Sequence, residues 1–173
     1  MKLAGWIIGL SLLLTSPVAA QEAGENQARN GDLMALQLWT SDVKRFHKEW
    51  EQPTPPNLTT TTSAQRNEPI YLMILFAGCK VDDSGNCKLS GRVTITDPDG
   101  LPYGDPVQLP EWSSPRPNPQ AIYLSPDSMG LTIEAGEKLG TYRISVQVTD
   151  ENAGISATTY QTITVSEALA SPA

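Results

Sequence analysis

The sequence predicts a mainly β protein, an antiparallel sandwich of two sheets with one short α-helix near the N-terminus. Three observations support this fold class. Residues 70–77 (IYLMILFA) are apolar at every position, as in a strand that is covered on both faces. Residues 87–96 and 140–150 alternate apolar and polar side chains, which is typical of half-buried strands. Turn sequences, such as DPDG at 97–100, separate these segments.

Residues 1–20 are typical of a secretory signal peptide. Lys2 supplies the charged start, an apolar stretch too short to span a bilayer follows, and small residues precede the expected cleavage site after Ala20. No cysteine lies at that site and no second long apolar segment follows, so we expect neither a lipid anchor nor a membrane span in the mature chain. The expected location is periplasmic or secreted. Residues 21–31 are interpreted as a disordered N-terminal tail and residues 166–173 as a C-terminal tail.

The mature chain is strongly acidic. Removal of the leader takes away Lys2 and leaves 11 basic against 19 acidic residues, a net charge of about −8. Such a chain is repelled by phosphate backbones and by anionic lipid surfaces. Nucleic acid is therefore not an expected partner. The remaining length suits one domain with its own core, which we place over residues 32–165.

A short amphipathic helix is predicted over about 42–51. Asp42 supplies the N-cap, and Val43, Phe46 and Trp50 recur on one helical face. The segment that is apolar on both sides needs cover on both, so we expect this helical face to pack near it.

Two segments flank the helix. Residues 33–39 (LMALQLW) are interpreted as a strand, although their Leu, Met and Ala content also fits a helical turn. Residues 53–67 begin with prolines that end the helix, and they show no apolar pattern. This second segment is interpreted as a linker.

Cys79 and Cys87 are expected to form a disulfide that clasps a β-hairpin. They flank the polar loop between the apolar strand and an alternating strand, and facing residues of paired strands lie within disulfide reach. An oxidising compartment keeps such a pair bonded, and a ring this small contributes about 2.5 kcal/mol in the loop-entropy account. Two free buried thiols are the alternative. A redox-active pair is not favoured, because the Cys-x-x-Cys spacing is missing.

Residues 98–119 contain seven of the fourteen prolines of the chain. Proline cannot donate a hydrogen bond inside a sheet, so only a brief edge strand is expected here, over 107–109. A proline-ordered loop loses little entropy on docking, and Trp, Tyr and Arg often anchor interfaces. We therefore single out a candidate interaction surface, Tyr103, Asp105, Trp112 and Arg116. The alternative is that Trp112 tucks under the loop and covers an open sheet edge.

Further short strands are expected at 121–124, 131–134 and 155–165. Within 140–150, one set of alternating residues is predicted to point into the core, Tyr142, Ile144, Val146 and Val148. The other set is predicted to point outward, Arg143, Ser145 and Gln147.

The segment GTYRISVQVTDENAG, followed by SATTYQTITV, resembles the last two strands of an immunoglobulin-like β-sandwich of the kind common in bacterial envelope proteins. The Gly-x-Tyr entry to the first of these strands and the Asp-x-x-x-Gly turn after it carry the resemblance, which covers about residues 68–165. It implies an immunoglobulin-like antiparallel sandwich. The cysteines depart from the antibody pattern, because they are expected to clasp a hairpin and no tryptophan lies between them. The resemblance implies a fold and no function.

Acidic residues gather in three turns, Asp82-Asp83, Asp97-Asp99 and Asp150-Glu151. If strands alternate in direction and two lie between residues 93 and 142, the first and third turns meet at one end of the sandwich. Their oxygen atoms suit calcium, but no calcium-loop spacing is present. Turn carboxylates are usually solvated, so a solvated turn without metal is the expectation for all three.

No catalytic motif stands out. The chain has one histidine, His47, with no second ligand or nucleophile within helical spacing, and it is interpreted as a solvated surface residue. A nucleophile elbow and a phosphate loop are both missing. We expect no catalytic residue, no cofactor and no metal.

The function expected from these observations is that of an exported, non-catalytic binding module that recognises another envelope protein or an extracellular ligand. The first alternative is a structural or assembly accessory of a surface appendage or secretion apparatus, which would need exposed strand edges. An enzyme of unknown type is the third possibility.

Overall fold

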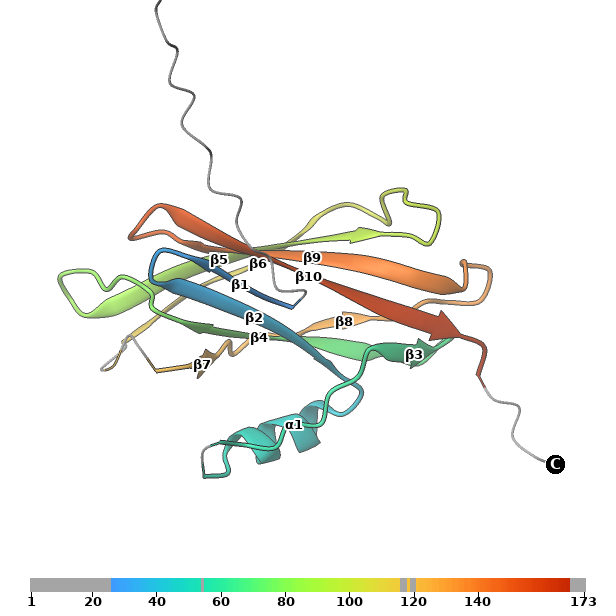
Figure 1. The fold of residues 1–173 in the computed structure, drawn as a ribbon, viewed down its shortest axis with the longest axis horizontal. Helices are drawn as coiled ribbons and strands as arrows, with labels where there is room; N and C mark the ends of the chain where they lie inside the picture. Colours follow the sequence, from blue (N-terminus) through green and yellow to red (C-terminus); the bar gives the residue numbers. More distant parts are fainter. Residues whose placement is uncertain (1–25, 54, 116–117, 119–120, 169–173) are drawn as a thin grey trace, which may run out of the picture.

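The computed structural model describes residues 26–53, 55–115, 118 and 121–168, and the predicted signal peptide lies outside that part of the chain. The described residues form two packed β-sheets and one helix, α1 (Val43–Trp50) (Figure 1). The first sheet contains β1 (Gln27–Asn30), β2 (Leu33–Thr40), β4 (Ile70–Ala77), β7 (Tyr123–Leu124) and β8 (Met129–Leu131). The second sheet contains, in spatial order, β3 (Ser63–Gln65), β10 (Ile155–Ser166), β9 (Gly140–Asp150), β5 (Asn86–Thr96) and β6 (Val107–Pro115). The predicted fold class, a mainly β immunoglobulin-like sandwich with one accessory helix, is confirmed.

Neighbouring strands pair antiparallel, except that β3 runs parallel to β10. In the first sheet, β4 pairs with β2 on one side and with both β7 and β8 on the other. Because β7 and β8 run in the same direction along β4, they act as one interrupted strand. The chain therefore keeps the alternation of strand direction that was assumed for placing the acidic turns.

The predicted β-hairpin around the two cysteines is wrong. β4 lies in the first sheet and β5 in the second, so the chain crosses the sandwich between Ala77 and Asn86. Gly78 permits the crossing, since its φ is +72° and a Cβ atom there would lie 1.7 Å from the carbonyl oxygen of Asp32. The two strands differ in pattern. β4 is apolar on both faces, whereas β5 alternates apolar and polar side chains and exposes one face to water.

The core lies between the two sheets and is built from the inward positions of the alternating strands. The predicted inward set of β9 is buried as expected, Tyr142, Ile144, Val146 and Val148. The hydroxyl group of Tyr142 donates to the carbonyl oxygen of Lys138 at 2.7 Å, the tyrosine corner found in immunoglobulin-like folds. Burial raises the pKa of the Tyr142 phenol.

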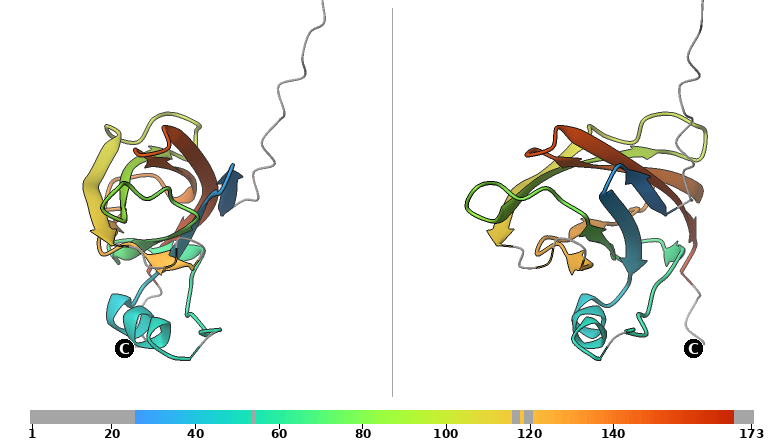
Figure 2. Two further views of the ribbon diagram at one scale, coloured as in Figure 1. Left: turned by 90° about the vertical axis from the view of Figure 1, so that its left-hand side faces the viewer. Right: turned by 60° about the vertical axis from the view of Figure 1, so that its left-hand side comes forward.

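The helix α1 covers the outer face of the first sheet, on the side away from the second sheet (Figures 1 and 2). Asp42 caps it by accepting from the backbone N–H of Arg45 at 2.9 Å. Phe46 is fully buried against Met73 and Leu75 of β4, and Trp50 is partly buried in the same cluster. The expectation that the helix covers the second face of this strand is confirmed.

Two segments without an apolar pattern nevertheless form strands. Part of the predicted disordered tail is β1, where Ala28 is buried and the backbone pairs with β2. Part of the predicted linker is β3, which pairs with the end of β10. Backbone hydrogen bonds do not require apolar side chains, which is why the sequence pattern predicts neither strand. The edge strand expected over 107–109 is longer than predicted and continues to Pro115.

Candidate functional site

The structure separates the aromatic residues of the Pro-rich stretch. Trp112 lies opposite Leu89 in the β5–β6 ladder, and its ring packs edge-on against Phe76 with centroids 4.8 Å apart. Tyr103 precedes β6, and its backbone N–H donates to the carbonyl oxygen of Ile95. Leu89 and Ile95 are six positions apart on β5, a separation of roughly 20 Å in a strand.

Both rings pack on core residues. The ring of Tyr103 lies 5.3 Å from that of Tyr142, and its hydroxyl group donates to Glu137 at 2.6 Å. Burial, followed by this bond to a carboxylate, raises the pKa of Tyr103. Asp105 is exposed, and Arg116 lies outside the described residues. The packing of both rings on the core fits the alternative that this stretch covers an open sheet edge. A role of the stretch in recognition stays a prediction.

The cleft beside Trp112 is small. It lies between the sheets, its walls include Phe76, Leu109 and Trp112, and its volume is about 30 Å³. Such a space holds about one water molecule. It is too small for a substrate or a cofactor.

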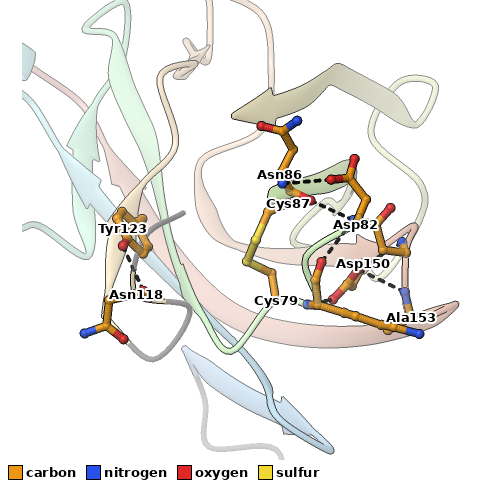
Figure 3. Close-up of a disulfide and its surroundings, with 10 residues drawn as sticks. Cys79, Asp82, Asn86, Cys87, Asn118, Tyr123, Asp150 and Ala153 are labelled. Carbon is orange, nitrogen blue, oxygen red and sulfur yellow. Dashed lines mark hydrogen bonds between the residues drawn. A yellow bond between two sulfur atoms is a disulfide. The ribbon is translucent and has the colours of Figure 1, made fainter. Parts of the chain in front are cut away.

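The first and third acidic turns meet at the disulfide end of the sandwich, as the strand parity predicts (Figure 3). Cys79 and Cys87 are bonded, with Cα atoms 5.9 Å apart, and the bond ties the start of the crossing loop, just after β4, to β5 of the second sheet. Beside it, the fully buried Asp150 accepts from three backbone N–H groups, those of Lys80 at 2.6 Å, Asn152 at 3.0 Å and Ala153 at 3.1 Å. This carboxylate therefore holds the crossing loop against the β9–β10 turn.

The other turn carboxylates also have local partners. Asp82 accepts from the backbone N–H groups of Ser84 and Asn86, each at 2.9 Å. Glu151 accepts from the hydroxyl group of Ser90. These bonds stabilise turns, and the described residues contain no group of three His, Cys, Asp or Glu side chains that could hold a metal ion.

At the opposite end, Lys138 forms ion pairs with Asp97 and Asp99, each at 2.6 Å. The hydrogen bond from Lys138 holds the pKa of Asp97 below its usual range. The hydrogen bonds to Asp97 and Asp99 in turn raise the pKa of Lys138. The turn is thereby tied to the segment that leads into β9. His47 is partly exposed on α1.

The outer face of the second sheet is a surface that sequence reasoning did not single out. We call it the polar face and define it by the outward positions of three strands: Ser90, Arg92, Thr94 and Thr96 of β5; Thr141, Arg143, Ser145, Gln147 and Thr149 of β9; and Ser156, Thr158, Tyr160, Thr162 and Thr164 of β10. In the described part of the chain, no helix or strand lies over it (Figures 1 and 2). None of these positions is Asp or Glu.

The register aligns the polar face in rows across the strands. Arg92 lies opposite Gln147, which lies opposite Thr158. The guanidinium group of Arg143 lies 4.5 Å from the centroid of the Tyr160 ring, a cation–π contact. These two residues line a surface hollow of about 160 Å³. These rows place hydroxyl, amide and guanidinium groups side by side on the outer surface of the sheet.

Arg92 and Arg143 are exposed, and within the described ranges neither forms an ion pair or a side-chain hydrogen bond. The alternation in 140–150 does predict that Arg143 points outward, but outward polar residues occur on any half-exposed strand. A signal in the sequence was available: in a chain with 19 acidic residues, the outward positions of three strands carry none.

No known protein family and no curated protein sequence matches the chain. Among solved structures, a similar fold is the CARDB domain of a Pyrococcus furiosus protein, crystallised in complex with di-metal ions. It is 17% identical in sequence, the match covers 62% of this chain and 86% of that domain, and the TM-score is 0.39. The fold described above rests on the strand topology and not on this likeness.

None of the helices in the described ranges is long and apolar enough to cross a membrane.

Proposed function

We propose that this chain is an exported, non-catalytic binding module that contacts its ligand through the polar face. The observation that carries the proposal is a bare sheet face with two guanidinium groups, those of Arg92 and Arg143, that no carboxylate of the described residues neutralises. Arginine is enriched where proteins bind other molecules, because its planar group donates several hydrogen bonds at once.

Binding is favoured over catalysis by the condition of the carboxylates. General acid or base catalysis needs a carboxyl group that is free to exchange a proton with a substrate. Asp150, the one fully buried carboxylate among the described residues, instead accepts from three backbone N–H groups. Asp150 lines a surface hollow of about 310 Å³ at the disulfide end, but these backbone hydrogen bonds occupy both of its carboxylate oxygen atoms.

An extracytoplasmic location is supported by the signal peptide pattern and by the disulfide between Cys79 and Cys87. Disulfides persist in oxidising compartments and are rare in the reducing cytosol. The expected ligand is therefore one that the periplasm or the cell exterior presents.

The condition of the strand edges speaks against assembly by strand addition. β1, β3, β7 and β8 have two to four residues each, and the longer edge strand β6 contains Pro110 and Pro115. The edge of β10 that β3 leaves unpaired faces β1, where Asn30 donates to the carbonyl oxygen of Ser156 at 2.9 Å. Short, proline-containing and covered edges resist pairing with another chain.

The proposal is tested by blocking the polar face without changing its charge. Fluorescently labelled mature protein is incubated with cells of the strain that produces it, beside the variants Ser145→Trp and Thr158→Trp. We expect retention by the cell surface with wild type and its loss with both variants, because a bulky ring prevents close contact with the sheet.

The matched control is Gln52→Trp, which places the same ring on an exposed, uncharged position just after α1, away from the second sheet. This variant should bind like wild type. Equal retention of all four proteins, or no retention of the wild type, would overturn the proposal.

A further inference from the structure

We propose that the ligand of the polar face is an acidic oligosaccharide, a chain of sugar rings that carries carboxylate groups. This inference rests on the proposed function and names the class of molecule that the face binds.

Charge complementarity indicates that the ligand is negatively charged. The molecule as a whole carries an excess of acidic residues, yet the polar face has no carboxylate among its outward positions and presents Arg92 and Arg143. Its one neighbouring cation on β5, Lys88, is paired with Glu111 at 3.2 Å. An anion thus meets two unpaired guanidinium groups here. The described residues present another group of cations on α1, Lys44, Arg45 and Lys48, of which Arg45 is paired with Glu49. Guanidinium groups bind carboxylates through two parallel hydrogen bonds.

The spacing of the two arginines gives the size of the ligand. Arg92 lies opposite Gln147 on the adjacent strand, and Arg143 is four positions further along that strand. From the rise per residue and the spacing between strands, their Cα atoms are roughly 14 Å apart. One sugar ring does not reach both. An oligomer with a carboxylate at intervals along its length does.

The residues between the two arginines give the chemistry of the ligand. Thr94, Ser145 and Gln147 lie in this interval and offer hydroxyl and amide groups, which both donate and accept hydrogen bonds. Sugar hydroxyl groups have the same dual capacity. Tyr160 adds a partly exposed ring beside Arg143, against which the C–H groups of a sugar ring can pack.

An acidic peptide fits this face less well. Extended peptides gain affinity by pairing with a sheet edge and by filling pockets with alternate side chains. The polar face lies in the middle of the sheet, where the backbone of β9 is already paired on both sides. Its hollow beside Arg143 is lined by polar residues and one ring, and it offers no apolar pocket.

The test uses isothermal titration calorimetry with the mature, disulfide-bonded protein and three probes of similar length: an oligogalacturonate of ten residues, a neutral dextran oligosaccharide and a poly-L-glutamate peptide. We expect saturable binding of the oligogalacturonate, weaker at high salt because the face is exposed. Dextran should not bind, and poly-L-glutamate should bind at least tenfold more weakly.

The variants Arg92→Gln and Arg143→Gln are each expected to lower the affinity for oligogalacturonate about tenfold, the effect of losing one charge-assisted contact. The control is Lys44→Gln, which makes the same change of net charge on α1 and should bind like wild type. Thermal melting of each variant should match that of the wild type.

The remaining outcomes overturn the inference. These are absence of oligogalacturonate binding, equal binding of poly-L-glutamate, and an equal loss in Lys44→Gln, which would indicate a general charge effect. If they occur while Ser145→Trp and Thr158→Trp still abolish retention by cells, the polar face binds another kind of ligand and only the sugar assignment is lost. If those two variants also retain binding to cells, the proposed function itself is wrong.

Discussion

The outer faces of the two sheets differ in polarity and in whether another element covers them. The outer face of the first sheet is apolar, with Met73 and Leu75 of β4 at its centre, and α1 covers it through Phe46 and Trp50. The outer face of the second sheet is polar, and no described helix or strand covers it. An apolar face exposed to water is costly, so it needs a cover, whereas a polar face does not. The helix is thus accounted for by stability, and the uncovered polar face is the surface that we propose as the binding site.

The comparison is tested most strongly by removing the main contact under the helix. Phe46→Ala should lower the free energy of unfolding by about 3–5 kcal/mol, because it leaves a cavity against the first sheet. Urea unfolding of the mature protein measures this loss. Lys44→Ala on the exposed side of the same helix should change stability by less than about 0.5 kcal/mol. Equal stability of the two variants would mean that the helix is not a cover.

The second test concerns the contact that joins α1 to the chain after it. Glu49 accepts from the backbone N–H of Thr59 at 2.6 Å and from its hydroxyl group at 2.7 Å, and it pairs with Arg45. The hydroxyl group of Thr59, followed by Arg45, holds the pKa of Glu49 below its usual value of 4.5. A carboxyl group whose pKa is lower in the folded state than in the unfolded state stabilises the protein at pH values above the unfolded-state pKa. This stabilisation is lost as the pH falls through the folded-state pKa.

Wild type should therefore be more stable than Glu49→Gln at pH 7, and the difference should close as the pH falls below about 4.5. Urea midpoints at pH 7, 5, 4 and 3 measure it. Glu51→Gln, which removes the same charge at the end of the helix, should differ less from wild type at pH 7. A Glu49→Gln difference that persists at pH 3 would contradict the account.

The smallest change in the free energy of unfolding is expected for substitutions on the polar face. Ser145→Ala and Thr158→Ala should each change the free energy of unfolding by no more than about 0.5 kcal/mol, because their side chains pack against no covering element. The same urea experiment measures this. A loss near that of Phe46→Ala would show that the polar face also stabilises the sandwich, and the contrast between the two sheets would disappear.

Much of the fold could be predicted because its elements are strongly patterned. The continuous apolar run of β4 predicted a strand with two covers, and the stripe through Phe46 and Trp50 predicted one of them. The pairing of Cys79 with Cys87 followed from their short separation and the expected compartment. The strand and its helical cover could be predicted because they depend on side-chain burial, which the sequence pattern reports directly. The disulfide was predicted from the compartment and from a hairpin that the structure does not contain.

What the sequence did not predict depends on how strands are arranged. A short loop between two strands fits a hairpin and a crossing between sheets equally well, and only the tertiary structure decides between them. β1 was missed because backbone pairing leaves no apolar period. The candidate surface in the Pro-rich stretch was predicted from residue types alone, and the structure places Tyr103 and Trp112 at different points along β5.

The crossing between β4 and β5 also bears on how quickly this sandwich can assemble. Sandwiches are slow to fold because most contacts between their sheets join residues far apart in the chain. Here, eight residues separate a strand of one sheet from a strand of the other, and the cysteines are eight positions apart. The entropy lost on closing so short a loop is small, and the bond keeps it closed in the unfolded chain. This corner supplies contacts between the sheets that are local in sequence, and it is where we expect the two layers to meet first.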